Sequence, residues 1–243
     1  MTPTHPVALV TGGSKGIGRA IAAALLEFRA HVLITGRNAA DLASAVEGLA
    51  PHGRPSGASV ASFAGDVRRE ADARAMVEAA VERCGGLDIL INNAAVGILV
   101  DAATMTGDQW RETIETNLSG VFYCTHAAIP HLRARGGGWI VNISSLASRN
   151  PFAGGAAYSA TKAGLNALGE ALMQELRYDG IRVSTVCPGS VRTGFAGSDA
   201  GAAADWKLAP EDVAQVVVDL IAHPGRSHPS HVDIRPSMPP RKK

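Results

Sequence analysis

A tyrosine and a lysine four residues apart form the pair in this sequence best suited to proton transfer. Tyr158 and Lys162 enclose the stretch Tyr-Ser-Ala-Thr-Lys, and on a helix this spacing places both side chains on one face. A free phenol has a pKa of about 10, and a neighbouring ammonium favours the phenolate and lowers that pKa. Tyr158 could then give a proton to a carbonyl oxygen or take one from an alcohol. Ser145, which closes the run Val141–Ser145, could hydrogen-bond the same oxygen.

The glycine-rich segment Thr11–Gly18 directly follows an apolar run. Its glycines allow a sharp turn and close contact with a ligand, and a helix that opens at Ile17 or Gly18 would present free N–H groups to a pyrophosphate. A tight strand-to-helix turn alone could also use three glycines. The segment is not a P-loop, because Lys15 is followed by glycine rather than by serine or threonine. It matches G-x-S-x-G, but a hydrolase elbow needs an oxyanion loop from an earlier strand, and only one strand precedes Ser14.

Short apolar, β-branched runs alternate with alanine-rich stretches along the whole chain. The predicted strands are residues 7–10, 31–35, 59–63, 87–91, 139–143, 182–186 and 232–234. The predicted helices are residues 18–28, 40–49, 69–84, 108–132, 158–178 and 210–222. Mostly apolar strands that alternate with helices indicate an α/β fold, a doubly wound parallel sheet of about seven strands with helices on both faces. We expect one domain over residues 1–243, with a surface loop at Pro51–Gly57.

Composition excludes several classes of protein. The formal net charge is +1, which argues against a strongly basic nucleic-acid binder. The longest strictly apolar run, Ala20–Leu26, is far shorter than a membrane helix, and the first residues do not resemble a signal peptide. Cys84, Cys124 and Cys187 are widely spaced and form no C-x-x-C pair, which predicts reduced thiols in a cytoplasmic protein.

The sequence predicts no metal site. His223, His228 and His231 are close together, but they lie in a proline-rich stretch without a nearby carboxylate or thiolate at matching spacing, which favours a surface loop. Cys187 is interpreted as a core residue rather than a nucleophile.

Several of these features occur in one order and together resemble the short-chain dehydrogenase/reductase family over about residues 6–223. They are Thr11–Gly18, Asp66-Val67, Asn92–Ala95, Asn117, Ser145, the Tyr158/Lys162 pair and Pro188-Gly189. The chain departs from the family pattern where Ala95 replaces a frequent glycine. It departs further over residues 224–243, which lack the glycine pair that many members carry after the last strand.

The resemblance implies a role for each matching residue. The implied catalytic residues are Asn117, Ser145, Tyr158 and Lys162, with Asn117 holding a water that links Lys162 to solvent. Asp66 would accept from the adenine amino group beside Val67, Asn93 would lie at the ribose, and Val191 and Thr193 would hold the carboxamide. The complete cofactor-binding set is Gly12, Ser14, Lys15, Gly16, Ile17, Gly18, Arg37, Asp66, Val67, Asn93, Tyr158, Lys162, Pro188, Gly189, Val191 and Thr193.

The end of the second predicted strand favours NADP(H) over NAD(H). NAD-using members carry an acidic residue there, whereas this chain has Gly36 followed by Arg37. Arg37 and Lys15 could meet a 2′-phosphate, which a carboxylate would repel. The alternative is that Arg37 is a solvated turn residue and that Lys15 faces water.

These features predict an NADP(H)-dependent oxidoreductase, a carbonyl reductase that interconverts a ketone or aldehyde and an alcohol. The alternatives are a catalytically idle NADP(H)-sensing protein and an NAD-linked alcohol dehydrogenase of the same fold. Val96, Leu146, Phe152, Phe195 and Trp206 are candidate pocket walls and suggest a hydrophobic carbonyl substrate, although a 3-oxoacyl thioester suits the sequence equally. Residues 193–207 are expected to form a lid. The resemblance also implies a homotetramer or homodimer built partly from the 108–132 and 158–178 helices.

Overall fold

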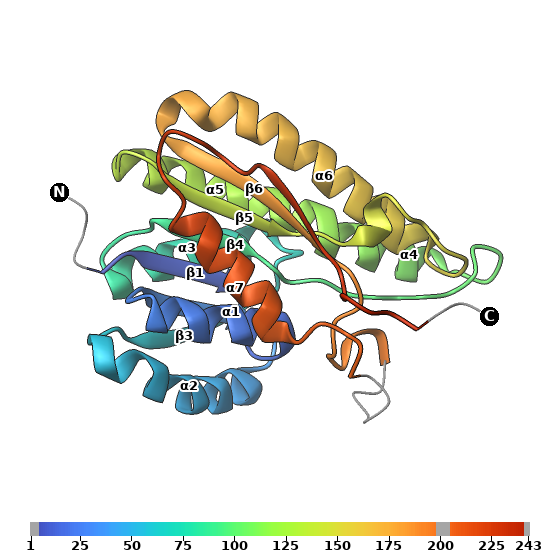
Figure 1. Ribbon diagram of the computed structural model, residues 1–243, viewed down its shortest axis with the longest axis horizontal. Coiled ribbons are helices and arrows are strands. Elements are labelled where there is room, and N and C mark those ends of the chain that lie inside the picture. The colour runs from blue at the N-terminus through green and yellow to red at the C-terminus, as the bar shows by residue number, and fades with distance from the viewer. Residues whose placement is uncertain (1–4, 198–204, 241–243) are drawn as a thin grey trace.

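The computed structural model describes residues 5–197 and 205–240 and contains a sheet of seven parallel strands. Their order in space is β3-β2-β1-β4-β5-β6-β7, so the chain starts in the middle and winds outward in both directions (Figure 1). The strands are β1 Val7–Thr11, β2 His31–Gly36, β3 Val60–Ala64, β4 Ile89–Asn92, β5 Gly138–Ile143, β6 Ile181–Pro188 and β7 His231–Ile234. The predicted doubly wound sheet is therefore confirmed.

Helices cover both faces of the sheet, with α1, α2 and α7 on one face and α3, α5 and α6 on the other (Figure 1). The main helices are α1 Gly16–Glu27, α2 Ala39–Gly53, α3 Glu70–Cys84, α4 Gly107–Ile114, α5 Gly120–Ala134, α6 Ala156–Leu176 and α7 Pro210–Ile221. Each face has its own hydrophobic core. Among the described residues, no helix is both long enough and apolar enough to cross a membrane.

The central strands are apolar throughout because both of their faces are covered. Every residue of β1 and of β4 is buried. In the parallel register, Val10 lies opposite Ile34 on one side and Ile91 on the other, all on the face of α1. Leu9, Leu33 and Leu90 occupy the opposite face. Continuous apolar runs of this kind are typical of parallel strands between two helical layers.

Local chemistry sets where several helices begin. Thr106 and Gln109 form a reciprocal capping box at α4, and the Asn38 side chain accepts from the first backbone N–H groups of α2. Pro210 opens α7, as its missing N–H allows. In contrast, Lys15 at the start of α1 makes no capping hydrogen bond through its side chain. The first N–H groups of α1 are thus left without a side-chain acceptor from that residue.

Three sequence expectations about elements need correction. The predicted helix 108–132 is divided into α4 and α5 by a π-helical turn at Glu115–Ser119. The loop predicted at Pro51–Gly57 is wrong, because α2 continues through Pro51 to Gly53 and a short 3₁₀ turn follows. His231 is not in a loop either; it begins β7, where the pairing with β6 determines its position.

Candidate active site

The predicted site residues meet where the strands end. In a parallel sheet all carboxyl ends lie along one edge, and a crevice opens where the winding direction reverses, here between β1 and β4. The glycine-rich segment follows β1, Asp66 follows β3, Asn93 follows β4, Ser145 follows β5 and Gly189 follows β6. The fold therefore assembles residues that are up to about 180 positions apart in sequence on one edge of the sheet.

The turn after β1 needs glycine at particular positions. Gly12 and Gly16 have φ values of +65° and +54°, a region that side-chain-bearing residues rarely adopt. A Cβ on Gly18 would lie 2.3 Å from the Gly12 carbonyl oxygen and 2.4 Å from Asn93 Nδ2. The Asn93 amide donates to the carbonyls of Thr11 and Gly12, so its side chain ties this turn to the end of β4. Ile17 packs against the core on the α1 face.

Tyr158 and Ser145 are neighbours in the structure. Tyr158 stands in the first turn of α6 and is partly buried, and its phenol is close enough to the Ser145 hydroxyl for that hydroxyl to affect its pKa. Burial raises the pKa of Tyr158 above its ordinary value, and the Ser145 hydroxyl offsets only part of that rise. The sequence predicts that a neighbouring ammonium lowers the pKa of Tyr158, but in the structure burial has the larger effect and the net shift of the pKa is upward. Burial therefore favours the protonated phenol.

Lys162 lies one turn further along α6 and is 3% exposed. Its Nζ donates to the Ile143 carbonyl oxygen at 2.8 Å and lies 5.8 Å from the centroid of the Tyr158 ring. Burial lowers the pKa of Lys162 to about 8, because an ammonium loses hydration there without a carboxylate beside it. The Lys162 ammonium therefore lies over the ring of Tyr158 and is held in place by the Ile143 carbonyl of β5.

Asn117 lies at the centre of the π-helical turn and is fully buried. Its Oδ1 accepts from the Val96 backbone N–H at 2.8 Å, and its Nδ2 donates to the Val96 carbonyl at 3.0 Å. Nδ2 also contacts Thr161 Oγ1, next to Lys162, at 3.3 Å. The side chain of Asn117 thus holds the segment after β4 in place, and π-turns of this kind are frequent at functional sites.

Asp66 is paired within the protein. Arg68 donates through Nε and Nη2 to the Asp66 carboxylate, with a shortest distance of 2.6 Å. Burial favours the neutral acid, but hydrogen bonds from Arg68 outweigh it and hold the pKa of Asp66 below its usual value. Val67, the next residue, is buried and would meet any side chain placed on Gly120. Asp66 is thus an ionised acceptor whose position Arg68 restrains.

Two basic side chains lie beside the glycine-rich turn, and only one of them, Lys15, is among the basic residues predicted from the sequence to bind the cofactor. Lys15 and Arg19 line one pocket together with Ser14 and Asp41. Arg37 is exposed and lies 3.6 Å from Glu112 Oε1, which also lies 3.6 Å from Arg68. Arg19, Arg68 and Glu112 are not among the site residues predicted from the sequence. The i, i+4 spacing of Lys15 and Arg19 at a helix start could have indicated Arg19, whereas the other two contacts depend on packing between distant elements.

The segment after β6 turns back across the site. Pro188 ends β6, Gly189 donates to the Ile234 carbonyl, and Val191 forms an isolated parallel bridge with Leu208. The Thr193 methyl lies within 3.4 Å of where a Gly16 side chain would begin. Phe195 follows, with its ring centroid 5.8 Å from that of Tyr158.

The residues predicted to line the substrate pocket are partly buried or exposed. Val96, Leu146 and Trp206 are partly buried, and Phe152 and Phe195 are exposed. Residues 198–204 of the predicted lid, including Gly201, lie outside the described residues.

Comparison with known proteins gives a consistent result. Residues 6–202 match the family model described as short chain dehydrogenase. The chain is 32% identical over 236 residues to an uncharacterised oxidoreductase of Staphylococcus saprophyticus, covering 95% of this chain and 97% of the relative. A metagenomic short-chain oxidoreductase solved in complex with NADP has a TM-score of 0.83 at 36% identity, covering 96% of this chain and 98% of the other. An alcohol dehydrogenase from Thermococcus sibiricus, complexed with 5-hydroxy-NADP, has a TM-score of 0.88 at 27% identity, with coverages of 98% and 100%.

Proposed function

The chain belongs to the short-chain dehydrogenase family, and from this premise we propose that it is an NADP(H)-dependent oxidoreductase that interconverts a carbonyl compound and an alcohol. The observation that carries the proposal is the placement of Tyr158 near Ser145, with the buried Lys162 over the tyrosine ring. A donor phenol and a neighbouring hydroxyl can both donate to a single substrate oxygen atom. A carbonyl oxygen that gains charge during reduction matches these two donors.

The chain's own residues handle the proton. When bound, a nicotinamide would supply hydride to the carbonyl carbon or remove it from an alcohol. Tyr158, which burial keeps protonated, donates its proton to the substrate oxygen as negative charge develops there. Ser145 donates a hydrogen bond to the same oxygen and orients it. The Lys162 ammonium, 5.8 Å from the ring centroid, stabilises the phenolate that remains.

The turn after β1 fits the phosphates of a dinucleotide. The N-terminal N–H groups of α1 receive no cap from the Lys15 side chain, and a helix N-terminus attracts anions. Glycines at 12 and 16 keep the backbone free of side chains where a phosphate would approach. On the resemblance to the family, we also assign Asp66 to the adenine, Asn93 to the ribose, and Val191 and Thr193 to the carboxamide.

The preference for NADP(H) is supported by the charges around Gly36. Glycine at this position leaves no carboxylate to repel a 2′-phosphate. Lys15 and Arg19 line a pocket together with Ser14, whose hydroxyl lies 3.8 Å from where a Gly36 side chain would begin. Arg37 is exposed, so it can exchange its contact with Glu112 for a phosphate. Two of the similar solved structures carry NADP or its 5-hydroxy derivative.

The substrate proposal is a hydrophobic ketone or aldehyde, with reduction as the direction. It is supported by Phe195, whose ring lies beside that of Tyr158 and gives the proton donor an apolar neighbour. A 3-oxoacyl thioester is the second candidate, because an extended acyl chain can lie along the same surface.

A spectrophotometric assay of NADPH oxidation tests the proposal. The purified chain is offered aryl ketones, aliphatic aldehydes and 3-oxoacyl thioesters, each with NADPH and with NADH. We expect turnover with at least one carbonyl class and a higher kcat/KM for NADPH. Tight NADPH binding without turnover across the whole panel would instead favour an idle NADP(H)-sensing protein, and a higher kcat/KM for NADH would favour an NAD-linked alcohol dehydrogenase.

A further inference from the structure

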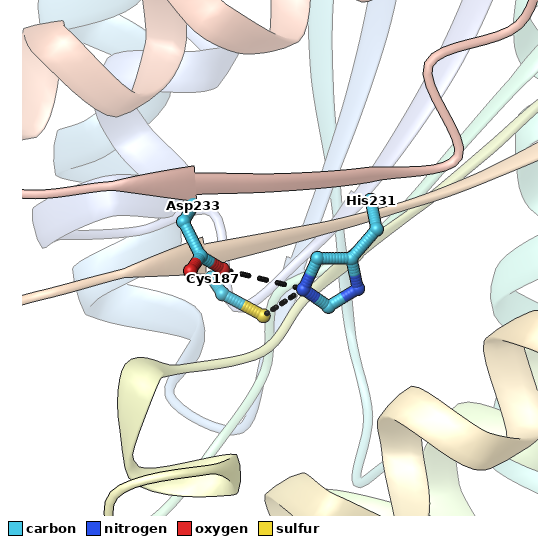
Figure 2. A group of neighbouring side chains, drawn as sticks. All are labelled: Cys187, His231 and Asp233. Atoms are coloured by element: carbon cyan, nitrogen blue, oxygen red, sulfur yellow. Dashed lines mark hydrogen bonds and ion pairs between the residues drawn. The ribbon is translucent and has the colours of Figure 1, made fainter.

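A thiol, an imidazole and a carboxylate meet on two neighbouring strands at the edge of the sheet. Cys187 on β6 lies opposite Asp233 on β7 in the parallel register. His231 is two residues before Asp233, so both side chains point to the same face of β7. Figure 2 shows the Cys187 sulfur and an Asp233 carboxylate oxygen both meeting the same nitrogen of the His231 imidazole. Nothing in the mechanism proposed above uses these three groups.

From this juxtaposition we propose that Cys187, His231 and Asp233 form a binding site for one thiophilic divalent cation, with Zn²⁺ as the best match. Cys187 is close enough to Lys162 and Tyr158 on α6 for its charge to act on both side chains, but the proposal does not rest on the catalytic activity. It replaces the sequence prediction that the chain has no metal site, which rested on placing His231 in a loop.

The distances suit tetrahedral coordination. The Cys187 Sγ lies 3.4 Å from His231 Nε2, which lies 3.3 Å from Asp233 Oδ1, and all three atoms are within 4.8 Å of one another. With typical zinc bond lengths, the edges of such a tetrahedron between sulfur, nitrogen and oxygen are about 3.4–3.6 Å. Small side-chain rotations would therefore complete three corners, and the fourth would be open to water. The thiolate excludes Mg²⁺ and Ca²⁺ as preferred ions.

The surroundings of the cluster both support and oppose a cation. Asn166 Oδ1 lies 3.7 Å from Cys187 Sγ and can orient the sulfur from α6. The Arg149 guanidinium contacts both His231 Nε2 and Asp233 Oδ1, and Arg235 contacts the other Asp233 oxygen at 3.1 Å. Both arginine side chains are more than half exposed, so they can swing into water. Arg149 thus occupies the place where the ligand lone pairs converge, and it must leave when the metal binds.

Binding also has a proton balance. The Cys187 thiol releases its proton to solvent as sulfur forms a bond to the metal, while His231 must be neutral to offer Nε2. Metal affinity should therefore increase with pH, and each bound ion should release a proton that can be detected in weakly buffered solution.

Titration with Co²⁺ tests the site directly, because cobalt replaces zinc and reports its ligands by absorption. The full chain is treated with chelator, desalted and titrated with CoCl₂. We expect saturation at one ion per chain with a sulfur-to-cobalt charge-transfer band, and Zn²⁺ should abolish that band. Cys187→Ser should remove the band. His231→Ala and Asp233→Asn should each weaken binding by more than the roughly 10- to 100-fold typical of losing an outer-shell partner.

Matched control variants distinguish this site from nonspecific metal binding elsewhere on the protein. Cys84→Ser and His228→Ala change the same residue types outside the cluster and should leave the titration unchanged. Arg149→Ala should tighten binding, because it removes the competing cation. Since His231 is on the surface, its variant remains informative if Cys187→Ser fails to fold, which circular dichroism detects. Absence of the charge-transfer band in the wild type, or its loss in Cys84→Ser, would overturn the proposal.

Discussion

Tyr158 must change its protonation state while it remains partly buried, and its neighbours determine how that is possible. Burial favours the neutral phenol, and the Ser145 hydroxyl favours the phenolate. Lys162 lies close to the ring but is held by the Ile143 carbonyl. The protein alone therefore keeps the phenol protonated, and the positive charge of an oxidised nicotinamide would shift the balance toward phenolate. In this proposal, the direction of proton transfer follows the redox state of the cofactor.

The first prediction concerns this proton. Tyr158→Phe removes only the phenolic oxygen, so turnover should fall by about 10²–10⁴-fold or more while NADPH still binds. The measurement is kcat with the best carbonyl substrate, together with a fluorescence titration of NADPH. Turnover close to the wild-type value would remove Tyr158 from the proposed role.

The second prediction uses the buried lysine. Burial lowers the pKa of Lys162 to about 8 from 10.5, so between these pH values the unfolded chain binds more protons than the native protein. The free energy of unfolding contributed by Lys162 should therefore rise as pH increases through this window. A pKa difference of this size corresponds to about 3 kcal/mol.

Urea unfolding at several pH values checks this. Lys162→Met removes the titrating group, so its free energy of unfolding should not rise with pH as that of the wild type does. The difference between variant and wild type should therefore favour the variant most at pH 7 and should decline by up to about 3 kcal/mol toward pH 10.5. Lys15→Met, in which an exposed lysine is lost, should run parallel to the wild type. Parallel curves for Lys162→Met as well would show that the native lysine is not desolvated.

The third prediction concerns the choice of cofactor. A charge-assisted contact to the 2′-phosphate contributes roughly 1.5–3 kcal/mol, so Arg37→Ala should weaken NADPH binding by about ten- to a hundredfold. NADH, which lacks the phosphate, should be almost unaffected. Arg19→Ala should behave in the same way if Arg19 shares the phosphate. The measurement is kcat/KM with both cofactors, and equal losses for NADPH and NADH would mean that the arginine supports the fold instead.

Gly36→Asp should shift the cofactor preference from NADPH towards NADH more strongly than Arg37→Ala does. The reason is that a carboxylate repels the 2′-phosphate and accepts hydrogen bonds from ribose hydroxyls. The structure has room for this side chain, since a Cβ on Gly36 meets its nearest neighbour, the Leu42 side chain, at 3.6 Å. A variant that binds NADPH as tightly as the wild type would place the 2′-phosphate elsewhere.

At the level of elements, the turn between β1 and α1 depends on contacts within the protein as much as on the ligand. From the sequence, Gly18 is predicted to lie where a phosphate of the cofactor approaches. In the structure, a side chain there would first meet the Gly12 carbonyl and the Asn93 amide. Asn93 therefore couples the shape of the phosphate turn to the end of β4.

The fourth prediction follows from this packing. Gly18→Ala should weaken NADPH binding severely and also lower the melting temperature, because overpacking costs about 1–3 kcal/mol. For a chain of this size that corresponds to a decrease of roughly 2–12 °C. Gly36→Ala is the matched control, since its Cβ makes only ordinary contacts, and it should melt close to the wild type. Unchanged NADPH affinity in Gly18→Ala would contradict the placement of the phosphates.

At the scale of the whole molecule, large apolar side chains remain exposed on α4 and α5. Trp110 is 44% exposed and Phe122 is 48% exposed. Phe122 stacks on His126 of the same helix, with ring centroids 5.7 Å apart. Exposed aromatic groups of this kind are typical of contact surfaces between subunits. They support the expectation that the chain forms a homodimer or homotetramer partly through the 108–132 region.

The fifth prediction is that Phe122→Glu reduces self-association. Light scattering after size-exclusion chromatography should give a multiple of the 25.1 kDa chain mass for the wild type and a smaller assembly for the variant. Met238→Glu, which changes an exposed apolar residue far along the chain, should retain the wild-type mass. A monomeric wild type would refute the expected assembly.

The sequence by itself determined most of the strands and helices and the edge of the sheet where the site lies. Continuous apolar runs such as Val7–Val10 encode strands covered on both faces, because burial on two sides leaves no polar position. Residues that directly follow such runs, including Ser145 and Asn93, must then share one edge, because all strands are parallel. Only the tertiary structure decided which side chains touch across elements. The contacts of Arg37 and Arg68 with Glu112, and the meeting of Cys187 with His231 and Asp233, depend on packing and strand register. Parallel strands are joined by long crossovers rather than by tight turns, so the residues that pair across them are distant in sequence and no local pattern specifies their pairing.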